Sequence, residues 1–344
     1  MTVNMKGLGR LLAGVVLSIG ATATSTLAET TLSLSSWLPP RHPLVVNAVE
    51  PWADKVEEVT EGRVTVRVLA KPMGPPPAHF DIAAEGVADI AYGLHSFTTD
   101  DRFKRSRIGQ FSFIGDDAVA ASKAFWNIYS GQLEAQKEHQ GVKLLGLFVH
   151  GPGVLHSKDR KIEGRADLSG LKIRVPGGYI SDLMADLGAT TLFMSSSEVY
   201  EKLSRGVIDG VTFTYEALTA FKLTNDIKYT MRVPGGFYNT TWFLVMNEAK
   251  WNEISPEDQA AIEAISGLAF AELAGIAWNA ADEAAKAAIN EAGIEVYDAP
   301  APLLEEIKAS AAKFEATWAE DVAKDGYDGA AALQALRAET GVEY

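Results

Sequence analysis

Hydrophobic and polar residues alternate over several short stretches near the start of the chain, which predicts β-strands with one buried face. The pattern covers Thr30 to Ser35, Arg63 to Leu69 and Ala88 to Tyr92. Amphipathic helices are predicted between these strands, at 44–61 and 78–86, and each ends at or next to a glycine. This order of strands and helices is typical of a parallel sheet with right-handed crossovers.

A second series of the same kind begins near residue 170. Leu171 to Val175 and Thr190 to Met194 have the pattern of strands, and helices are predicted at 177–187 and 195–205. The sequence therefore predicts two similar α/β halves.

Two short segments, one in each half, resemble each other. In 85–90 and in 205–210 a glycine ends a helix and a strand bearing an aspartate begins at once. We place the first crossing between the halves near 149–152 and the return near 234–236, where proline and glycine interrupt the pattern. Two crossing segments predict a hinge, with a ligand cleft between two lobes.

The last third of the chain predicts mainly helices. Ala260 to Ala292 is rich in alanine, glutamate and leucine and predicts a long helix across both lobes, with Gly267 or Gly275 as the site of a kink. We therefore expect an α/β protein with the following parts: lobe 1 at 29–150, completed by a return strand near 238–247, lobe 2 at 151–237, and a helical scaffold at 248–344 that packs on both lobes.

The first 28 residues have the features of a secretory signal. Lys6 and Arg10 precede an apolar run at 11–20, and small residues follow as far as Ala28. The run is shorter than the roughly 20 residues that a membrane span needs, so we expect cleavage after Ala28 and a protein outside the cytoplasm; a retained membrane anchor is the alternative. The chain contains no cysteine, which excludes disulfides and a lipid-bearing cysteine.

Charge and motif content exclude several classes of function. The net charge of −14 becomes about −16 without the signal, which argues against nucleic acid and anionic membrane surfaces as partners. The sequence has no nucleophile elbow, phosphate-binding loop or complete dinucleotide fingerprint. No two of the six histidines have the spacing that puts a pair of metal ligands on one helix face. We expect a binding protein without a metal or cofactor, and no enzyme activity.

Arg174 is the strongest candidate for a binding residue. The strand at 171–175 ends beside it, because Pro176 lacks a backbone donor and Gly177 and Gly178 form a turn. Ligands of open α/β sheets bind beyond the carboxyl ends of the strands, and a guanidinium matches a carboxylate with two parallel hydrogen bonds. The alternative is an ordinary surface arginine at a strand end.

Several segments resemble the substrate-binding subunits of tripartite ATP-independent periplasmic (TRAP) transporters, the DctP-like family. The resemblance extends from about Thr30 to Gly267 and is densest in these segments: Asp167 to Gly178, Leu187 to Thr190, Glu198 to Leu203, Gly206 to Gly210, Phe221 to Leu223 and Phe243 to Asn247. It implies a two-lobed, type II-like periplasmic receptor, expected to be a monomer, that delivers an organic acid to separate membrane permease subunits. The signature arginine of the family, which pairs with the ligand carboxylate, corresponds to Arg174.

Two positions depart from relatives that bind dicarboxylates or sialic acid. Val154 stands where many carry a second basic residue, and Phe213 stands where many carry an asparagine. Both changes make the cleft more apolar, so we expect a monocarboxylate with a hydrophobic or aromatic body. A secreted enzyme that acts on a carboxylic acid and an ABC-type binding protein are the alternatives.

Other candidates for the cleft lie near strand ends or the predicted crossings. These residues are Trp37, His79, Tyr92, His95, Tyr215 and Trp242, in addition to Phe213. Packing in the core is the alternative for each aromatic ring, and His95 is as well explained by a hydrogen bond to the backbone as by one to a ligand hydroxyl.

Overall fold

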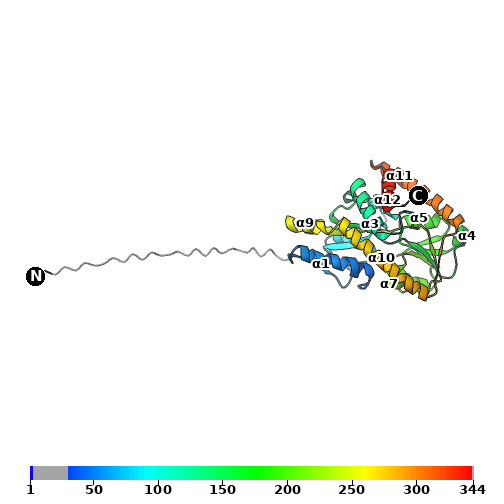
Figure 1. The fold of residues 1–344 in the computed structure, drawn as a ribbon, viewed down its shortest axis with the longest axis horizontal. Helices are drawn as coiled ribbons and strands as arrows, with labels where there is room; N and C mark the ends of the chain where they lie inside the picture. The colour runs from blue at the N-terminus through cyan, green and yellow to red at the C-terminus, as the bar shows by residue number, and fades with distance from the viewer. Residues whose placement is uncertain (3–29, 99, 343–344) are drawn as a thin grey trace.

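Two β-sheets organise the computed structural model, which describes residues 1–2, 30–98 and 100–342. The predicted signal segment therefore lies, apart from its first two residues, outside the described residues. Each sheet forms the centre of one lobe, and helices cover the sheets (Figure 1). We call the lobe with the five-stranded sheet lobe 1 and the lobe with the six-stranded sheet lobe 2.

The sheet of lobe 1 has the order β2-β1-β3-β10-β4. Its strands are β1 (Thr30–Ser35), β2 (Val64–Val68), β3 (Ile90–Leu94), β4 (Val142–Val149) and β10 (Thr241–Asn247). The first three are parallel, as the alternating strands and helices predict, whereas β10 is antiparallel to both β3 and β4. The chain thus returns from lobe 2 to the middle of this sheet.

The sheet of lobe 2 has the order β11-β9-β5-β8-β6-β7. Its strands are β5 (Val154–Ser157), β6 (Lys172–Val175), β7 (Thr190–Phe193), β8 (Gly210–Phe213), β9 (Tyr229–Arg232) and β11 (Glu295–Asp298). The predicted helical scaffold after residue 248 is wrong in one respect, because β11 lies within it and pairs with β9. A four-residue edge strand with every position exposed or half-buried is too short and too polar to stand out from the sequence.

Helices surround both sheets. Those next to lobe 1 are α1 (Glu50–Val59), α2 (His79–Ala84), α3 (Ala118–Asn127), α8 (Glu248–Asn252) and α9 (Pro256–Ala264). Those of lobe 2 are α4 (Arg165–Leu168), α5 (Tyr179–Asp186), α6 (Ser196–Ser204) and α7 (Glu216–Ala220). The C-terminal helices are α10 (Leu268–Glu291), α11 (Ala301–Ala323) and α12 (Gly329–Thr340).

The long helix α10 joins the two lobes (Figure 1). It packs on α3 and β4 of lobe 1 and on α7 of lobe 2. The run Pro256–Glu291 is long and apolar enough to cross a membrane by composition alone, but α10 buries ten of its residues against the lobes, as a core helix does. The predicted α/β fold with two lobes and a long C-terminal helix is therefore confirmed.

Two helix boundaries differ from the prediction. The helix predicted at 44–61 begins as a π-helical turn, Val45–Val49, because Pro51 has no N–H to continue the hydrogen-bond series. The predicted kink in the long helix is a break at Gly267, whose φ of +59° ends α9 and starts α10. Gly275 makes no kink, and its lack of a side chain instead lets α10 approach the backbone of α3 closely.

The repeated aspartate segment has the same function in both halves. Asp89 accepts hydrogen bonds from the backbone N–H and hydroxyl of Ser33 in β1, both 2.7 Å long. Asp209 accepts a hydrogen bond of 2.9 Å from the backbone N–H of Lys172, the first residue of β6. In each half the aspartate that follows a helix-ending glycine thus ties two parallel strands together.

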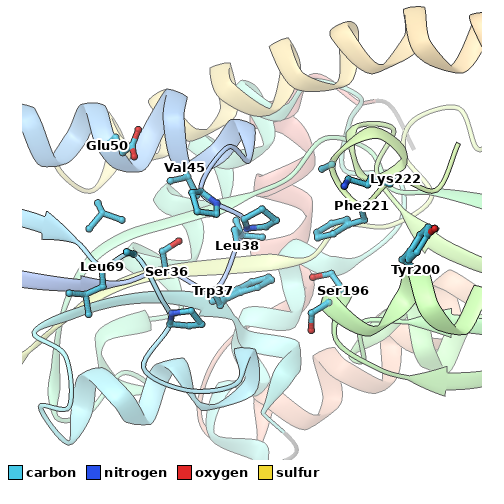
Figure 2. A pocket seen from close by; sticks show the side chains of 17 residues that line it. Ser36, Trp37, Leu38, Val45, Glu50, Leu69, Ser196, Tyr200, Phe221 and Lys222 are labelled. Atoms are coloured by element: carbon cyan, nitrogen blue, oxygen red, sulfur yellow. The ribbon is translucent and has the colours of Figure 1, made fainter.

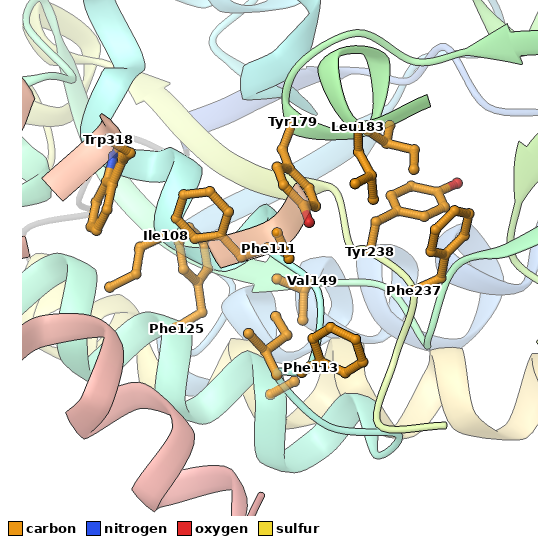
Figure 3. Close-up of a cluster of buried hydrophobic side chains, with 14 of the residues drawn as sticks. Ile108, Phe111, Phe113, Phe125, Val149, Tyr179, Leu183, Phe237, Tyr238 and Trp318 are labelled. Atoms are coloured by element: carbon orange, nitrogen blue, oxygen red, sulfur yellow. The ribbon is translucent and has the colours of Figure 1, made fainter. Parts of the chain in front are cut away.

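The chain passes between the lobes after β4 and returns before β10. The two passages touch, since the Gly153 N–H donates to the Tyr238 carbonyl at 2.9 Å. A continuous apolar core lies beside them and combines Phe125 and Val149 of lobe 1 with Tyr179 and Leu183 of lobe 2 (Figure 3). The lobes are therefore firmly packed on the side of the passages.

Candidate functional site

A small cavity lies between the two lobes. The residues of its wall come from both lobes, from the segments that pass between the lobes, and from α10. They are Trp37, Leu38, His42, Leu94, Phe97, His150, Arg174, Pro176, Ser196, Phe213, Thr214, Glu216, Phe221, Tyr238, Thr240, Trp242 and Trp278. The cavity thus depends on both lobes and on the helix that joins them.

The parallel strands aim their carboxyl ends at this cavity. Trp37 follows β1, Arg174 stands near the end of β6, and Phe213 ends β8. In parallel sheets the loops at this edge carry the binding groups, and here the two sheets present that edge to each other. The strand periodicity therefore brings residues that are far apart in the sequence to one place.

Arg174 is a buried cation on the wall of the cavity, with only 1% of its surface exposed. Its Nε donates to the Met194 carbonyl at 3.0 Å and its Nη1 to the Thr212 carbonyl at 3.1 Å. These bonds fix the guanidinium plane, and they use two of its five N–H groups. Burial lowers the pKa of Arg174 to about 10, with Tyr238 and Glu198 acting in the opposite direction, so the group stays charged at neutral pH. None of the described carboxylates lies within ion-pair distance of it.

Aromatic rings form two walls of the cavity. In lobe 1 the rings of Trp37 and Trp242 stack with 5.5 Å between centroids, and in lobe 2 those of Phe213 and Phe221 stack with 5.6 Å. The guanidinium of Arg174 lies 4.1 Å from the centroid of Phe213, a cation–π contact. A flat apolar group with an anionic end fits walls of this kind.

The cavity also gathers buried polar atoms that have no partner. Among the described residues six buried side-chain polar atoms make no hydrogen bond, and four of them belong to residues in its wall: Glu216 Oε2, Thr240 Oγ1, Trp242 Nε1 and Trp278 Nε1. An unpaired buried polar atom costs about 1–3 kcal/mol. Their concentration in one place indicates that a bound molecule supplies the partners.

Burial also sets the protonation of the titratable groups in the wall. It lowers the pKa values of His42 and His150 to about 4, so both imidazoles are neutral near pH 7. Burial, together with the nearby charge of Asp282, raises the pKa of Glu216 to about 8. Arg174 is therefore the one group among the described wall residues that carries a positive charge at neutral pH.

A wider pocket opens outward from the cavity between the lobes (Figure 2). Trp37 and Leu38 of lobe 1 face Phe221 and Ser196 of lobe 2 across it, and all four also border the cavity. Tyr200 is half exposed on the lobe 2 side of the same pocket. The pocket therefore adjoins the cavity through these four shared residues.

The structure brings four of the predicted site residues together in the wall. Trp37, Arg174, Phe213 and Trp242 all border the cavity. Trp37 is held in place by a hydrogen bond of 3.1 Å from its Nε1 to the carbonyl of Tyr92. These four residues therefore belong to the candidate site.

The other four predicted residues lie outside the wall, so their assignment to the cleft is corrected. Tyr92 is buried behind Trp37 with its hydroxyl bonded to Ser36. His79 is bonded to Ser35 at 3.1 Å, and His95 to His139 at 3.0 Å. Tyr215 packs in the apolar core of lobe 2. The contacts of all four side chains are with their own lobe rather than with the cleft.

Other residues of the wall were not predicted from the sequence. His42, Glu216, Phe221, Thr240 and Trp278 belong to this group. Glu216 comes three residues after Phe213, the last residue of a strand, so its position could have suggested a place in the cleft. Trp278 lies in the middle of an alanine-rich helix, where no sequence pattern indicates a binding residue. Val154, which we used to argue for an apolar cleft, is instead a buried core residue of lobe 2 that pairs with Phe213 in the sheet.

Residues 34–324 match the family described as bacterial extracellular solute-binding protein, family 7. The chain belongs to this family. This family 7 receptor is 31% identical over 322 residues to the outer membrane transporter protein TsaT of Comamonas testosteroni, a match that covers 92% of this chain and 93% of the relative. The predicted relation to TRAP solute receptors is thus confirmed.

Two solved structures of TRAP solute-binding proteins resemble the receptor closely. One, from Bordetella bronchiseptica, contains bound (R)- and (S)-mandelate; it is 37% identical, with a TM-score of 0.88, and the match covers 91% of this chain and 99% of that one. The other comes from an unidentified marine microbe, is described as specific for aromatic acid ligands and contains 3-hydroxybenzoate. It is 30% identical, with a TM-score of 0.84, and the match covers 91% and 98% of the two chains. The receptor therefore has the fold of transport-associated solute receptors.

Proposed function

We propose that this family 7 receptor binds an aromatic monocarboxylate in the cavity between its lobes, with Arg174 paired to the carboxylate. We further propose that it acts in the periplasm and delivers the ligand to the permease subunits of a TRAP transporter. The relatives that hold mandelate and 3-hydroxybenzoate support this class of ligand.

The observation that carries the proposal is the buried, unpaired charge of Arg174. A charge away from water is costly unless it has a partner, and the described residues provide Arg174 with no carboxylate within ion-pair distance. A ligand carboxylate would supply that partner with two charge-assisted hydrogen bonds. The guanidinium lies over Phe213, so a carboxylate paired with it would sit at the edge of the aromatic wall, and the body of the ligand would lie against the rings of that wall.

The wall also explains why a second carboxylate is not favoured. No second lysine or arginine belongs to the described wall residues, and the two histidines there are neutral near pH 7. A second carboxylate would lose its hydration without gaining a cationic partner, a penalty of several kcal/mol. An aromatic ring would instead gain about 2–3 kcal/mol by burial between the rings.

Calorimetry on substitutions of Arg174 tests the proposal. Arg174→Ala should weaken the binding of benzoate, mandelate and 3-hydroxybenzoate at least about 100-fold, which corresponds to about 2.7 kcal/mol. Arg174→Lys should lose nearly as much, because an ammonium cannot make the planar pair of bonds. Arg205→Ala, which removes an exposed arginine paired with Glu201 on α6, is the matched control and should bind as the wild type does.

Two results would refute the assignment. Near wild-type affinity of the Arg174→Ala variant would remove this residue from the site. Tight binding of succinate together with no binding of any aromatic acid would show that the apolar wall does not select the ligand.

A further inference from the structure

The side chain of Glu216 puts a buried carboxyl group in the wall of the cavity. Its side chain is only 3% exposed, yet it belongs to the residues that border the cavity. Its Oε1 accepts a hydrogen bond of 2.9 Å from the Thr214 hydroxyl, whereas its Oε2 has no partner among the described residues. One carboxyl oxygen is thus satisfied by the protein and the other is left for a bound molecule.

The surroundings keep this carboxyl group neutral. Asp282 of α10 accepts a hydrogen bond of 2.9 Å from the backbone N–H of Glu216 and adds a nearby negative charge. Burial and that charge raise the pKa of Glu216 to about 8, so it holds its proton at pH 7. Because Oε1 acts as an acceptor, the proton belongs on Oε2, which then is a hydrogen-bond donor without an acceptor.

A second unpaired donor lies in the same part of the wall. The imidazole of His42 lies 3.8 Å from Glu216 Oε1, and its ring centroid is 5.7 Å from that of Trp278. The indole Nε1 of Trp278 is buried and makes no hydrogen bond within the described structure. Glu216 of lobe 2, His42 of lobe 1 and Trp278 of α10 therefore meet around one polar patch.

Arg174 and Glu216 border the same cavity, and among the described residues no ion pair joins them. The patch presents donors and carries no positive charge, so an anionic group would find no cationic partner there. A neutral oxygen such as a hydroxyl suits it, since it can accept from both donors.

We propose that Glu216 and Trp278 form a second subsite that hydrogen-bonds a hydroxyl group on the body of the ligand. This inference rests on the proposed function, in which Arg174 binds the carboxylate of an aromatic acid. It makes Glu216 a specificity-determining residue: the receptor prefers hydroxylated aromatic monocarboxylates to the unsubstituted acids.

Titration calorimetry with benzoate and the three hydroxybenzoate isomers tests this subsite. In the wild type at least one isomer should bind about tenfold or more tighter than benzoate. Glu216→Met should remove this preference, so that benzoate and the three hydroxybenzoates bind the variant with affinities within about threefold of one another. Glu216→Gln keeps a neutral donor of the same size and should retain most of the preference.

Two further variants keep the result interpretable if Glu216→Met does not fold. Trp278→Phe keeps the packing and removes only the N–H, so it should lower the preference for the hydroxylated acid about threefold to tenfold. Tyr215→Phe changes the residue before Glu216 without altering the wall, and its selectivity should equal that of the wild type.

Different experimental results would refute the hydroxyl subsite and the proposed function. If benzoate binds through Arg174 but no hydroxybenzoate binds more tightly, or if the preference survives in both Glu216→Met and Trp278→Phe, the subsite is refuted and the proposed function stands. If 4-(aminomethyl)benzoate, which carries a cation, binds more tightly than every hydroxybenzoate, the patch is a cation site and the inference is wrong. If no aromatic acid binds at all, the proposed function itself fails.

Discussion

All six histidines of the chain are buried, with at most 6% of the surface of each exposed. Burial lowers the pKa of four of them to about 4: His42, His139, His150 and His156. It lowers the pKa of the remaining two as well, His79 and His95. Each imidazole is neutral in the folded protein at a pH where the unfolded chain, with a pKa of 6.5, already binds a proton.

At the residue scale, the lower pKa of the histidines in the folded chain than in the unfolded chain predicts that the protein becomes less stable in acid. As the pH falls from about 6.5 to 4 the unfolded chain takes up protons that the folded chain does not, so the free energy of unfolding decreases by about 1.4 kcal/mol per pH unit for each proton. Glu216 and Asp282, whose pKa values are raised to about 8 and 7, act in the opposite direction and offset part of the loss. The four histidines with a pKa of about 4 and the two carboxyl groups together give an expected net decrease of about 3 kcal/mol between pH 7 and pH 5 in chemical denaturation, and His79 and His95 add to it.

His156 offers the control for this prediction. Its Nδ1 contacts the Thr230 hydroxyl at 2.8 Å and its Nε2 contacts the Thr214 carbonyl at 3.2 Å. His156→Gln removes one titrating group, so the variant should be less stable at pH 7 but should lose about 2 kcal/mol less than the wild type between pH 7 and pH 5. Equal unfolding free energies of the wild type at the two pH values would contradict the account.

At the scale of single elements, the close approach of α10 to α3 depends on Gly275. A Cβ atom at this position would lie 2.6 Å from the Cα of Val119 and 2.7 Å from the carbonyl oxygen of Ala118, which are backbone atoms that cannot turn away. The gain in helix propensity from alanine is about 1 kcal/mol, whereas forcing extra atoms into a packed contact costs about 1–3 kcal/mol, with backbone contacts at the upper end.

Gly275→Ala should therefore destabilise the receptor by about 1–2 kcal/mol, measured by urea denaturation. Gly131→Ala is the matched control, because a Cβ atom there would have no neighbour within 4 Å and the backbone needs no left-handed conformation. The control should be neutral or slightly stabilising. A Gly275→Ala variant as stable as the control would show that α10 can shift away from α3 at no cost.

At the scale of the whole molecule, contacts between the lobes close the cavity. The rings of Phe97 in lobe 1 and Phe193 in lobe 2 meet edge to face with 6.2 Å between centroids. Next to them the Ser96 hydroxyl donates to the carbonyl of Pro176 at 3.1 Å. Phe193 is about half exposed and lies away from the core, so its main packing partner is the opposite lobe.

Phe193→Ala should therefore speed the release of the ligand more than it slows binding. An edge-to-face pair contributes about 0.5–1.5 kcal/mol, which corresponds to a dissociation rate about threefold to tenfold higher in stopped-flow measurements. The exposed Val296 in the edge strand β11 is far from the cavity wall, and Val296→Ala should leave the rate unchanged. An unchanged dissociation rate in Phe193→Ala would mean that other contacts hold the lobes closed.

The sequence by itself determined the elements and the place of the anion site. Periodicity depends only on local neighbours, so it located the parallel strands β1, β2 and β3 of lobe 1, the strands β6 and β7 of lobe 2, and the strand end that carries Arg174. The residues that support the family resemblance belong to the same segments, and the family match covers them.

Only the tertiary structure decided which side chains share the cavity. Periodicity does not fix which way a residue beyond a strand end points, and Tyr92 and His95 turned into lobe 1 while Trp37 turned into the cleft. The packing of α10 brought Trp278 beside Glu216, more than sixty positions away in the chain. The protonation of Glu216 likewise follows from burial beside Asp282, and burial is a property of the packed chain that no local pattern of residues contains.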